Sequence, residues 1–198
     1  MSEALPSVYL ARHGETAWTL SGQHTGRTDL PLTQRGEEQA RSLGRRLHGM
    51  SFAAALTSPS QRARRTAELA GFGSQAETAP DLAEWDYGRY EGRRTADILL
   101  ERPGWFIFRD GCPEGEMPDQ VAARADRAIR RIRAAHGNVL IFSSAHILRV
   151  LAARWLGLDA AGGRFFLLDT SSLSILGHEH NNIAEPAIRL WNEPHQPP

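Results

Sequence analysis

Short apolar runs alternate with segments of helical spacing along this chain, and that alternation most constrains its fold. The spacing predicts strands at residues 8–11, 52–57, 138–144, 171–177 and 187–191. It predicts helices after Thr33 and at residues 58–71, 119–136 and 146–157, with Ser58 as the cap and Pro59 as the first residue of the second helix. Strands that alternate with helices favour a three-layer α/β/α sandwich with a mostly parallel central sheet.

The 198 residues are expected to form a single domain, because no repeat and no linker divides them. Residues 79–118 are polar and show little periodicity, so no helix or strand is predicted there. The proline-containing end, residues 191–198, is predicted to be a frayed tail.

The charges exclude several classes of function. The 23 acidic and 23 basic residues cancel, so no net field attracts nucleic acid or a membrane surface. Every one of those basic residues is arginine, which excludes Schiff-base chemistry on lysine and the lysine-bearing phosphate loop. The arginine-rich segment at residues 119–136 is interpreted as a solvated helix face rather than a nucleic-acid site.

The same residue inventory bears on location and cysteine chemistry. Because no signal peptide or membrane span is evident, a cytoplasmic location is expected. Cys112 is the single cysteine, so neither an internal disulfide nor a cysteine zinc cluster can form within the chain. It lies in a turn-like stretch without an adjacent base, and we interpret it as incidental.

Polar residues follow three of the predicted strands at the edge where ligands bind in open α/β sheets. Arg12 and His13 follow the first strand, residues 58–62 the second and residues 143–146 the third. A neutral imidazole can attack phosphorus when its other nitrogen donates to a carbonyl that fixes the tautomer. Gly14 would let the backbone turn sharply beside His13.

Six stretches in order carry a family resemblance: RHGETAW, GQHTGRTDLPLT, SPSQRARRTAE, LAEWDYGRYEG, RDGCPEGE and SSAHILRVLAARWLG. They resemble the histidine phosphatase superfamily, with its phosphoglycerate mutase-like fold, and cover most of the chain. The middle stretches EWDYGRYEG and FRDGCPEGE, together with the later stretch FFLLDTSSLSILGHEHNN, are most similar to the branch with sedoheptulose-1,7-bisphosphatase and bacterial acid phosphatases.

The resemblance implies a set of site residues. His13 matches the histidine that becomes phosphorylated, Arg12 and Arg62 the phosphate-binding arginines, Glu84 the proton donor and His146 the second histidine of the phosphate pocket. These groups suit phosphoryl transfer, because fixed donors stabilise the charge on the transferring group. If protonated, His146 would add a third cation. The carboxylates of Asp86 and Glu91 are nearby rivals of Glu84 that miss the motif position.

Further residues are implied as substrate contacts. Thr25 and Gly26 match positions that contact phosphate or substrate in relatives, and Thr19 keeps a donor where the family usually has asparagine. Two interpretations of Arg109 have equal support. It contacts a second phosphate or a sugar hydroxyl of the substrate, or it is an exposed arginine without a functional contact. The other departure is Ile147, which follows His146 where relatives have glycine.

Three functions follow as alternatives. The first is a phosphatase that hydrolyses small phosphorylated metabolites, such as sugar phosphates or bisphosphates, through phosphohistidine. The second is a phosphoglycerate mutase, which the short middle segment disfavours, and the third is a catalytically weak protein that binds phosphorylated ligands. No cofactor or metal is required, and His178 and His180 are assigned to the surface. The sequence leaves homodimer formation open.

Overall fold

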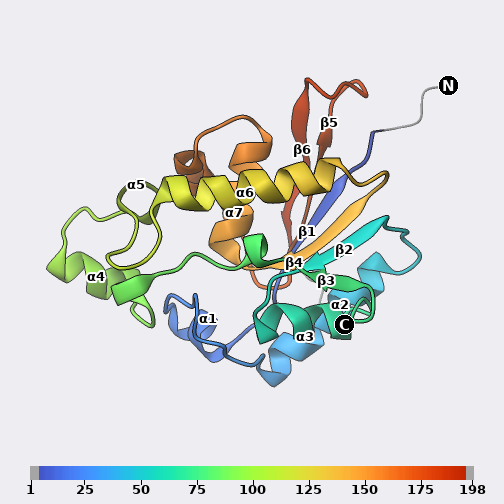
Figure 1. Ribbon diagram of the computed structural model, residues 1–198. Coiled ribbons are helices and arrows are strands. Elements are labelled where there is room, and N and C mark those ends of the chain that lie inside the picture. The colour runs from blue at the N-terminus through green and yellow to red at the C-terminus, as the bar shows by residue number, and fades with distance from the viewer. Residues whose placement is uncertain (1–4, 195–198) are drawn as a thin grey trace.

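The computed structural model describes residues 5–194 and shows one six-stranded sheet with helices on both faces (Figure 1). The strands lie in the order β3-β2-β4-β1-β5-β6. The elements follow one another along the chain as β1 (Val8–Arg12), α1 (Ala17–Ser21), α2 (Gln34–Leu47), β2 (Ala54–Thr57), α3 (Gln61–Leu69), β3 (Ala76–Thr78), η1 (Pro80–Leu82), η2 (Gly88–Tyr90), α4 (Thr95–Glu101), α5 (Ile107–Asp110), α6 (Pro118–Arg133), β4 (Val139–Ser143), α7 (Ala145–Trp155), η3 (Ala160–Phe165), β5 (Leu173–His178) and β6 (Pro186–Glu193).

The sheet is mixed but mostly parallel, which confirms the predicted fold class. β1 pairs in parallel with β4, β4 with β2, and β2 with β3. β5 runs antiparallel to both β1 and β6. The carboxyl ends of β1, β2 and β4 therefore meet at one edge of the sheet, where open α/β sheets bind ligands.

Two apolar clusters fill the spaces between the sheet and its helices. α6 and α7 cover one face, where Ile129 and Leu151 pack in the same cluster as Leu10 and Ile141 of the sheet. α2 and α3 cover the opposite face, where side chains such as Leu43 join a second cluster. Side chains of β1 and β4 divide between the two clusters, because successive residues of a strand point to opposite faces of the sheet.

The local predictions differ from the structure at several boundaries. α3 begins at Gln61 with Ser60 at the N-cap, so Ser58 and Pro59 belong to the preceding turn rather than to the helix start. The three-residue strand β3 was not predicted, because it is largely exposed and shows no apolar pattern. Its order comes from pairing with β2.

Two longer stretches also depart from the predictions. Residues 79–118 contain the short helices η1, η2, α4 and α5, none long enough to give a clear helical period. At the other end of the chain, β6 continues to Glu193. Residues 191–193 therefore belong to a strand, whereas the sequence predicts a frayed tail there. The last residues of that predicted tail, 195–198, lie outside the described part.

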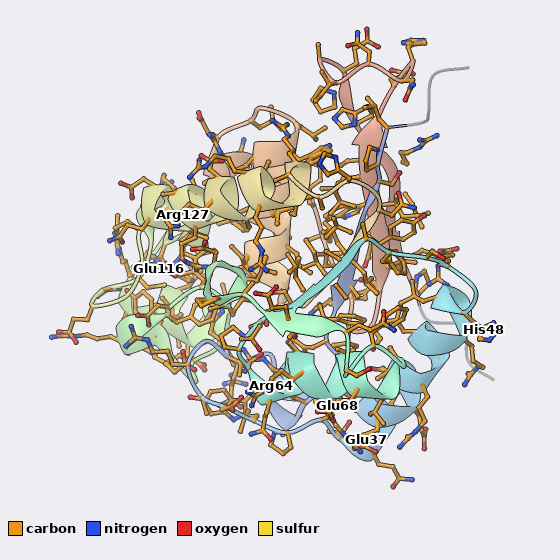
Figure 2. All side chains as sticks on the ribbon, turned by 45° about the vertical axis from the view of Figure 1, so that its right-hand side comes forward. Glu37, His48, Arg64, Glu68, Glu116 and Arg127 are labelled. Atoms are coloured by element: carbon orange, nitrogen blue, oxygen red, sulfur yellow. The ribbon has the colours of Figure 1, made fainter. Side chains whose placement is uncertain are left out.

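Ion pairs between arginines and carboxylates cover the outer helix faces. Arg65 of α3 contacts both Glu37 of α2 at 2.9 Å and Glu68 at 3.2 Å, and Figure 2 labels these two carboxylates. Four arginines on or beside α6 form ion pairs of the same kind: Arg124 with Glu116, Arg127 with Asp81, Arg131 with Glu77, and Arg154 with Asp126. This agrees with the interpretation of α6 as a solvated face. Within residues 5–194, no helix is long and apolar enough to cross a membrane.

Candidate active site

His13 lies directly after β1, at the centre of the ligand-binding edge. Its backbone N–H donates to the carbonyl of Ser143 at 2.9 Å, and its own carbonyl accepts from the N–H of Ser171 at 3.1 Å. The residue is therefore held from both neighbouring strands, and only 3% of it is exposed. A rigid position of this kind suits a nucleophile that must meet its target in one geometry.

The imidazole of His13 has the tautomer that phosphoryl transfer requires. Nδ1 lies 2.7 Å from the carbonyl oxygen of Gly14, so Nδ1–H donates and Nε2 keeps its lone pair. Burial lowers the pKa of His13 well below 6.5, and the charges of Arg62 and Arg12 lower it further. His13 is thus neutral, with the lone pair of Nε2 exposed to a reaction partner. Gly14 serves close packing, because a Cβ there would meet the carbonyl of Gly36.

Arg62 is fully buried and organises the loop at residues 22–33. Nη2 donates to the carbonyls of Thr25 at 2.9 Å and Gly26 at 3.1 Å, and Nη1 donates to Thr28 at 3.1 Å. Arg12 donates through Nη1 to the carbonyl of Leu168. The Nε atoms of both arginines are buried without a partner in the described chain. These N–H groups remain available to a phosphoryl oxygen.

The same loop is held from a second side by Glu91. Its carboxylate accepts the N–H of Gly26 at 2.9 Å and that of Thr28 at 3.0 Å. The Gly26 position is also crowded, since a Cβ would lie 2.6 Å from the carbonyl oxygen of Trp85. Thr25 is nearly buried, and its hydroxyl donates to the carbonyl of Gln23. From the sequence, Glu91 is only an alternative to Glu84 as the proton donor. Its role in holding the loop depends on contacts between residues about 65 positions apart in the chain.

The carboxylate of Glu84, a residue of the segment between η1 and η2, lies beside the N-terminus of α7. Its carboxylate accepts backbone N–H groups from His146 at 3.0 Å, from Ile147 at 2.9 Å and from Trp85 at 2.9 Å. These three donors fix the position of the carboxylate beside the first turn of α7. Its charge also acts on the buried guanidinium of Arg12. The fold thus brings Glu84 to the same edge as the residues that surround His13.

A cleft of about 400 Å³ opens beside this carboxylate. Its lining includes Gly26, Ser58, Glu84, Asp86 and Arg124. Arg27 stands at its exposed side and forms a 2.7 Å ion pair with Asp86. The volume is in the range of sites for small molecules.

His146 is half-buried, and its ring lies in an aromatic cluster with Trp85, Tyr87 and Phe108. His24 stacks on Tyr87 in the same cluster. Its Nδ1 lies 2.6 Å from the phenol oxygen of Tyr87. Burial lowers the pKa of His146 well below 6.5, and nearby Arg149 adds to the effect. This direction favours the neutral imidazole, so the condition under which His146 would add a third cation is not favoured in this arrangement. The sequence showed the histidine but not the ring environment that keeps it neutral.

The two departures from the family pattern have ordinary structural explanations. The Thr19 hydroxyl forms a capping box with Thr16, donating to its carbonyl and accepting its N–H, both at 2.8 Å. Ile147 lies inside α7 without a positive φ and is fully buried in the core. A substrate contact by Thr19 stays a prediction.

Arg109 lies on the exposed side of α5. Its guanidinium pairs with Asp110 at 2.8 Å and donates to the carbonyl of Gly104 at 2.6 Å. Within residues 5–194, no hydrogen bond or ion pair joins Arg109 to Arg12, His13, Arg62, Glu84 or His146. Contact with a second phosphate stays a prediction.

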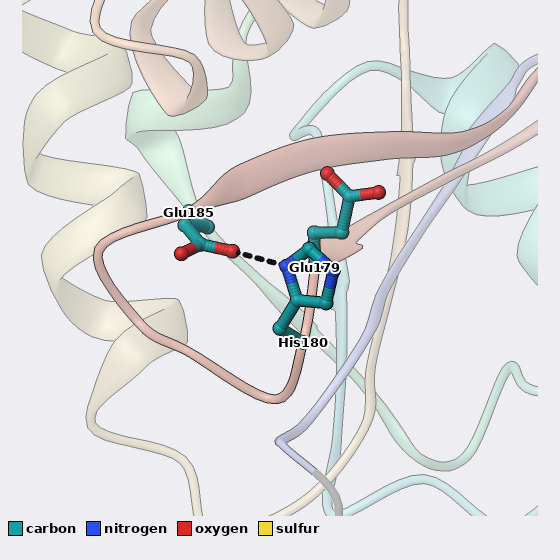
Figure 3. Close-up of side chains that lie close together, drawn as sticks. All are labelled: Glu179, His180 and Glu185. Carbon is teal, nitrogen blue, oxygen red and sulfur yellow. Dashed lines mark hydrogen bonds and ion pairs between the residues drawn. The ribbon is translucent and has the colours of Figure 1, made fainter.

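The remaining chemically capable groups lie apart from His13. Burial raises the pKa of the Cys112 thiol to about 12, which makes the thiol unreactive at neutral pH. Glu179, His180 and Glu185 gather at the exposed turn between β5 and β6, where His180 Nδ1 lies 2.7 Å from the Glu185 carboxylate (Figure 3). His178 is not a member of that group, and its ring packs against Trp155.

Comparison with known proteins agrees with this arrangement. Residues 8–194 match the model of the histidine phosphatase superfamily (branch 1). The chain is 41% identical to an acid phosphatase of Mycobacterium tuberculosis, with 94% of each chain covered. It is 32% identical to the sedoheptulose 1,7-bisphosphatase of Saccharomyces cerevisiae, over 96% of this chain and 94% of that protein.

A solved structure shows the same fold. The open reading frame Rv3214 of Mycobacterium tuberculosis superposes with a TM-score of 0.90 at 36% identity, over 96% of this chain and 99% of that one. The sequence match and the structural match both extend over nearly the whole described chain. The chain therefore belongs to branch 1 of the histidine phosphatase superfamily, as a phosphatase of that family.

Proposed function

We propose that this phosphatase hydrolyses small phosphorylated metabolites, such as sugar phosphates or bisphosphates, through a phosphohistidine on His13. The observation that carries the proposal is the neutral imidazole, whose Nδ1 donates to Gly14 while two buried arginines act on the same ring. This arrangement leaves Nε2 as a nucleophile among cationic donors.

The reaction would proceed in two steps. His13 Nε2 attacks phosphorus, the bond from phosphorus to the ester oxygen breaks, and a protonated Glu84 donates its proton to the leaving oxygen. Water then attacks the phosphohistidine, Glu84 takes a proton from that water, and His13 and inorganic phosphate are released. The unpartnered Nε–H groups of Arg12 and Arg62 would stabilise the charge on the phosphoryl oxygens in both steps.

The substrate class is supported by the cleft and by the relatives. A cleft of about 400 Å³ beside Glu84 admits a compound the size of a sugar phosphate. Its charged lining, with Arg27, Asp86 and Arg124, suits a polar leaving group with hydroxyls. One similar protein is an acid phosphatase and another is a sedoheptulose 1,7-bisphosphatase.

The test is phosphate release from a panel of p-nitrophenyl phosphate, 3-phosphoglycerate, fructose 1,6- and 2,6-bisphosphate and sedoheptulose 1,7-bisphosphate. We expect release by the wild type, none by His13→Ala, and an acid-labile phosphoryl group on the wild type after rapid quenching. Isomerisation of phosphoglycerate that depends on 2,3-bisphosphoglycerate, with little free phosphate, would instead identify a mutase. A wild type that binds phosphate but releases none would identify a binding protein.

A further inference from the structure

Ser144 occupies the position next to His13 on the neighbouring strand. β1 and β4 are parallel and their last paired residues are Arg12 and Ser143, so His13 and Ser144 are the residues that directly follow the two strands. Ser144 is 1% exposed. Its hydroxyl is buried and has no hydrogen-bond partner among the residues that the structure describes.

The free hydroxyl is unexpected, because Ser144 is the N-cap of α7. An N-cap serine normally accepts the backbone N–H of the second or third helical residue. Here those two residues are His146 and Ile147, and both of their N–H groups donate to the carboxylate of Glu84 instead. Glu84 therefore caps the helix, and the Ser144 hydroxyl has no capping function.

The adjacent serine shows the contrast. The Ser143 hydroxyl donates to the carbonyl of Leu82 at 2.6 Å and thereby joins β4 to η1. A buried hydroxyl without a hydrogen-bond partner costs free energy. A bound ligand that accepts a hydrogen bond from this hydroxyl would remove that cost. The two arginine Nε atoms near His13 are in the same unpartnered condition.

We propose that the Ser144 hydroxyl donates a hydrogen bond to an oxygen of the phosphoryl group as that group moves to and from His13 Nε2. No bond to the Ser144 oxygen forms or breaks; the hydroxyl only stabilises charge beside Arg12 and Arg62. The inference rests on the proposed phosphohistidine chemistry and assigns a further catalytic residue to the same site.

The experiment compares Ser144→Ala with Ser143→Ala in the full chain. We expect Ser144→Ala to lower kcat/KM for p-nitrophenyl phosphate by roughly 10- to 100-fold, as for loss of a hydrogen bond to a charged group. Inhibition by orthovanadate, which resembles the transition state, should weaken by a similar factor. The melting temperature of Ser144→Ala should equal or exceed that of the wild type, because no hydrogen bond within the protein is lost.

Ser143→Ala should behave in the opposite way. It leaves the Leu82 carbonyl without its partner, so the melting temperature should fall while kcat/KM per folded molecule falls far less than in Ser144→Ala. An unchanged kcat/KM and vanadate affinity in Ser144→Ala would overturn the inference, as would a loss of rate in Ser144→Ala that only follows a loss of folded protein. A wild type without phosphatase activity would contradict the proposed function itself, which is a distinct result.

Discussion

The phenol oxygen of Tyr87 and Nδ1 of His146 form a hydrogen bond across 2.6 Å. Burial raises the pKa of Tyr87 well above 10 and lowers that of His146 well below 6.5, so both groups are neutral at physiological pH. One proton therefore lies between the phenol oxygen and Nδ1, in either tautomer of the imidazole. The pair ties the segment after η1 to the first turn of α7, which is the turn that holds Glu84.

Tyr87→Phe tests whether this hydrogen bond contributes to stability. It leaves Nδ1 of His146 without its hydrogen-bond partner, so we expect the free energy of unfolding to fall by about 1–3 kcal/mol. The loss of kcat/KM should be far smaller than that of His13→Ala. Urea denaturation monitored by tryptophan fluorescence measures the first quantity. Tyr9→Phe, which keeps the ring contact with Phe52, is the control; a Tyr87→Phe variant as stable as the wild type would contradict the assignment.

Stability should decrease with acid, and His24 should account for part of the slope. Burial against Tyr87 lowers the pKa of His24 from the ordinary 6.5 to about 4. The unfolded chain therefore takes up a proton at a pH where the folded protein does not. The stabilisation is complete above about pH 6.5 and is lost as the pH falls towards about 4, with about 2 kcal/mol lost between pH 7 and 5 from this residue.

The matching variant is His24→Phe, which keeps a ring beside Tyr87 but cannot titrate. Urea midpoints at pH 7 and 5 should differ less for His24→Phe than for the wild type. The remaining slope would come partly from His13 and His146, whose pKa values are also lowered by burial. Substitution of the exposed His48, labelled in Figure 2, serves as the control. Equal slopes for His24→Phe and the wild type would show that His24 takes up its proton in the folded state.

The sequence predicts those features that depend on local pattern. The apolar runs identify β1, β2 and β4, and the motif around His13 identifies a residue at the end of a buried strand. The sequence does not show which residues from distant segments contact one another. Glu84 is 62 residues from His146, and only the packed structure shows that its carboxylate caps α7 and frees Ser144.

Glu91 illustrates the same limit and leads to a prediction for substrate binding. Its carboxylate holds the N–H groups of Gly26 and Thr28, which keeps the loop beside Arg62 in place. In Glu91→Gln one oxygen becomes an NH₂ group, so we expect a mobile loop and a KM for p-nitrophenyl phosphate raised about tenfold. Glu114→Gln, which changes only an exposed ion pair with Arg89, should leave KM unchanged. A normal KM in Glu91→Gln would show that Arg62 holds the loop alone.

Glu84→Gln should separate substrates by their leaving groups. A general acid contributes about 10²–10⁴-fold when the leaving oxygen needs a proton, as in an alkyl phosphate such as glycerol phosphate. p-Nitrophenolate leaves without protonation, so kcat/KM for its ester, which reports the first transfer to His13, should fall much less. Both values come from initial rates of phosphate or phenol release at one pH.

Asp86→Asn provides the matched control for that experiment. Asp86 lines the same cleft but forms an ion pair with Arg27. Asp86→Asn should therefore change kcat/KM for alkyl and aryl phosphates by the same factor. Glu84→Gln also changes the cap of α7. A purely structural effect of that change would lower kcat/KM for alkyl and aryl phosphates by the same factor. A ratio of alkyl to aryl kcat/KM that stays at the wild-type value in Glu84→Gln would therefore assign Glu84 to the helix cap alone. A ratio that falls about 10²-fold or more would assign the proton transfer to this carboxylate.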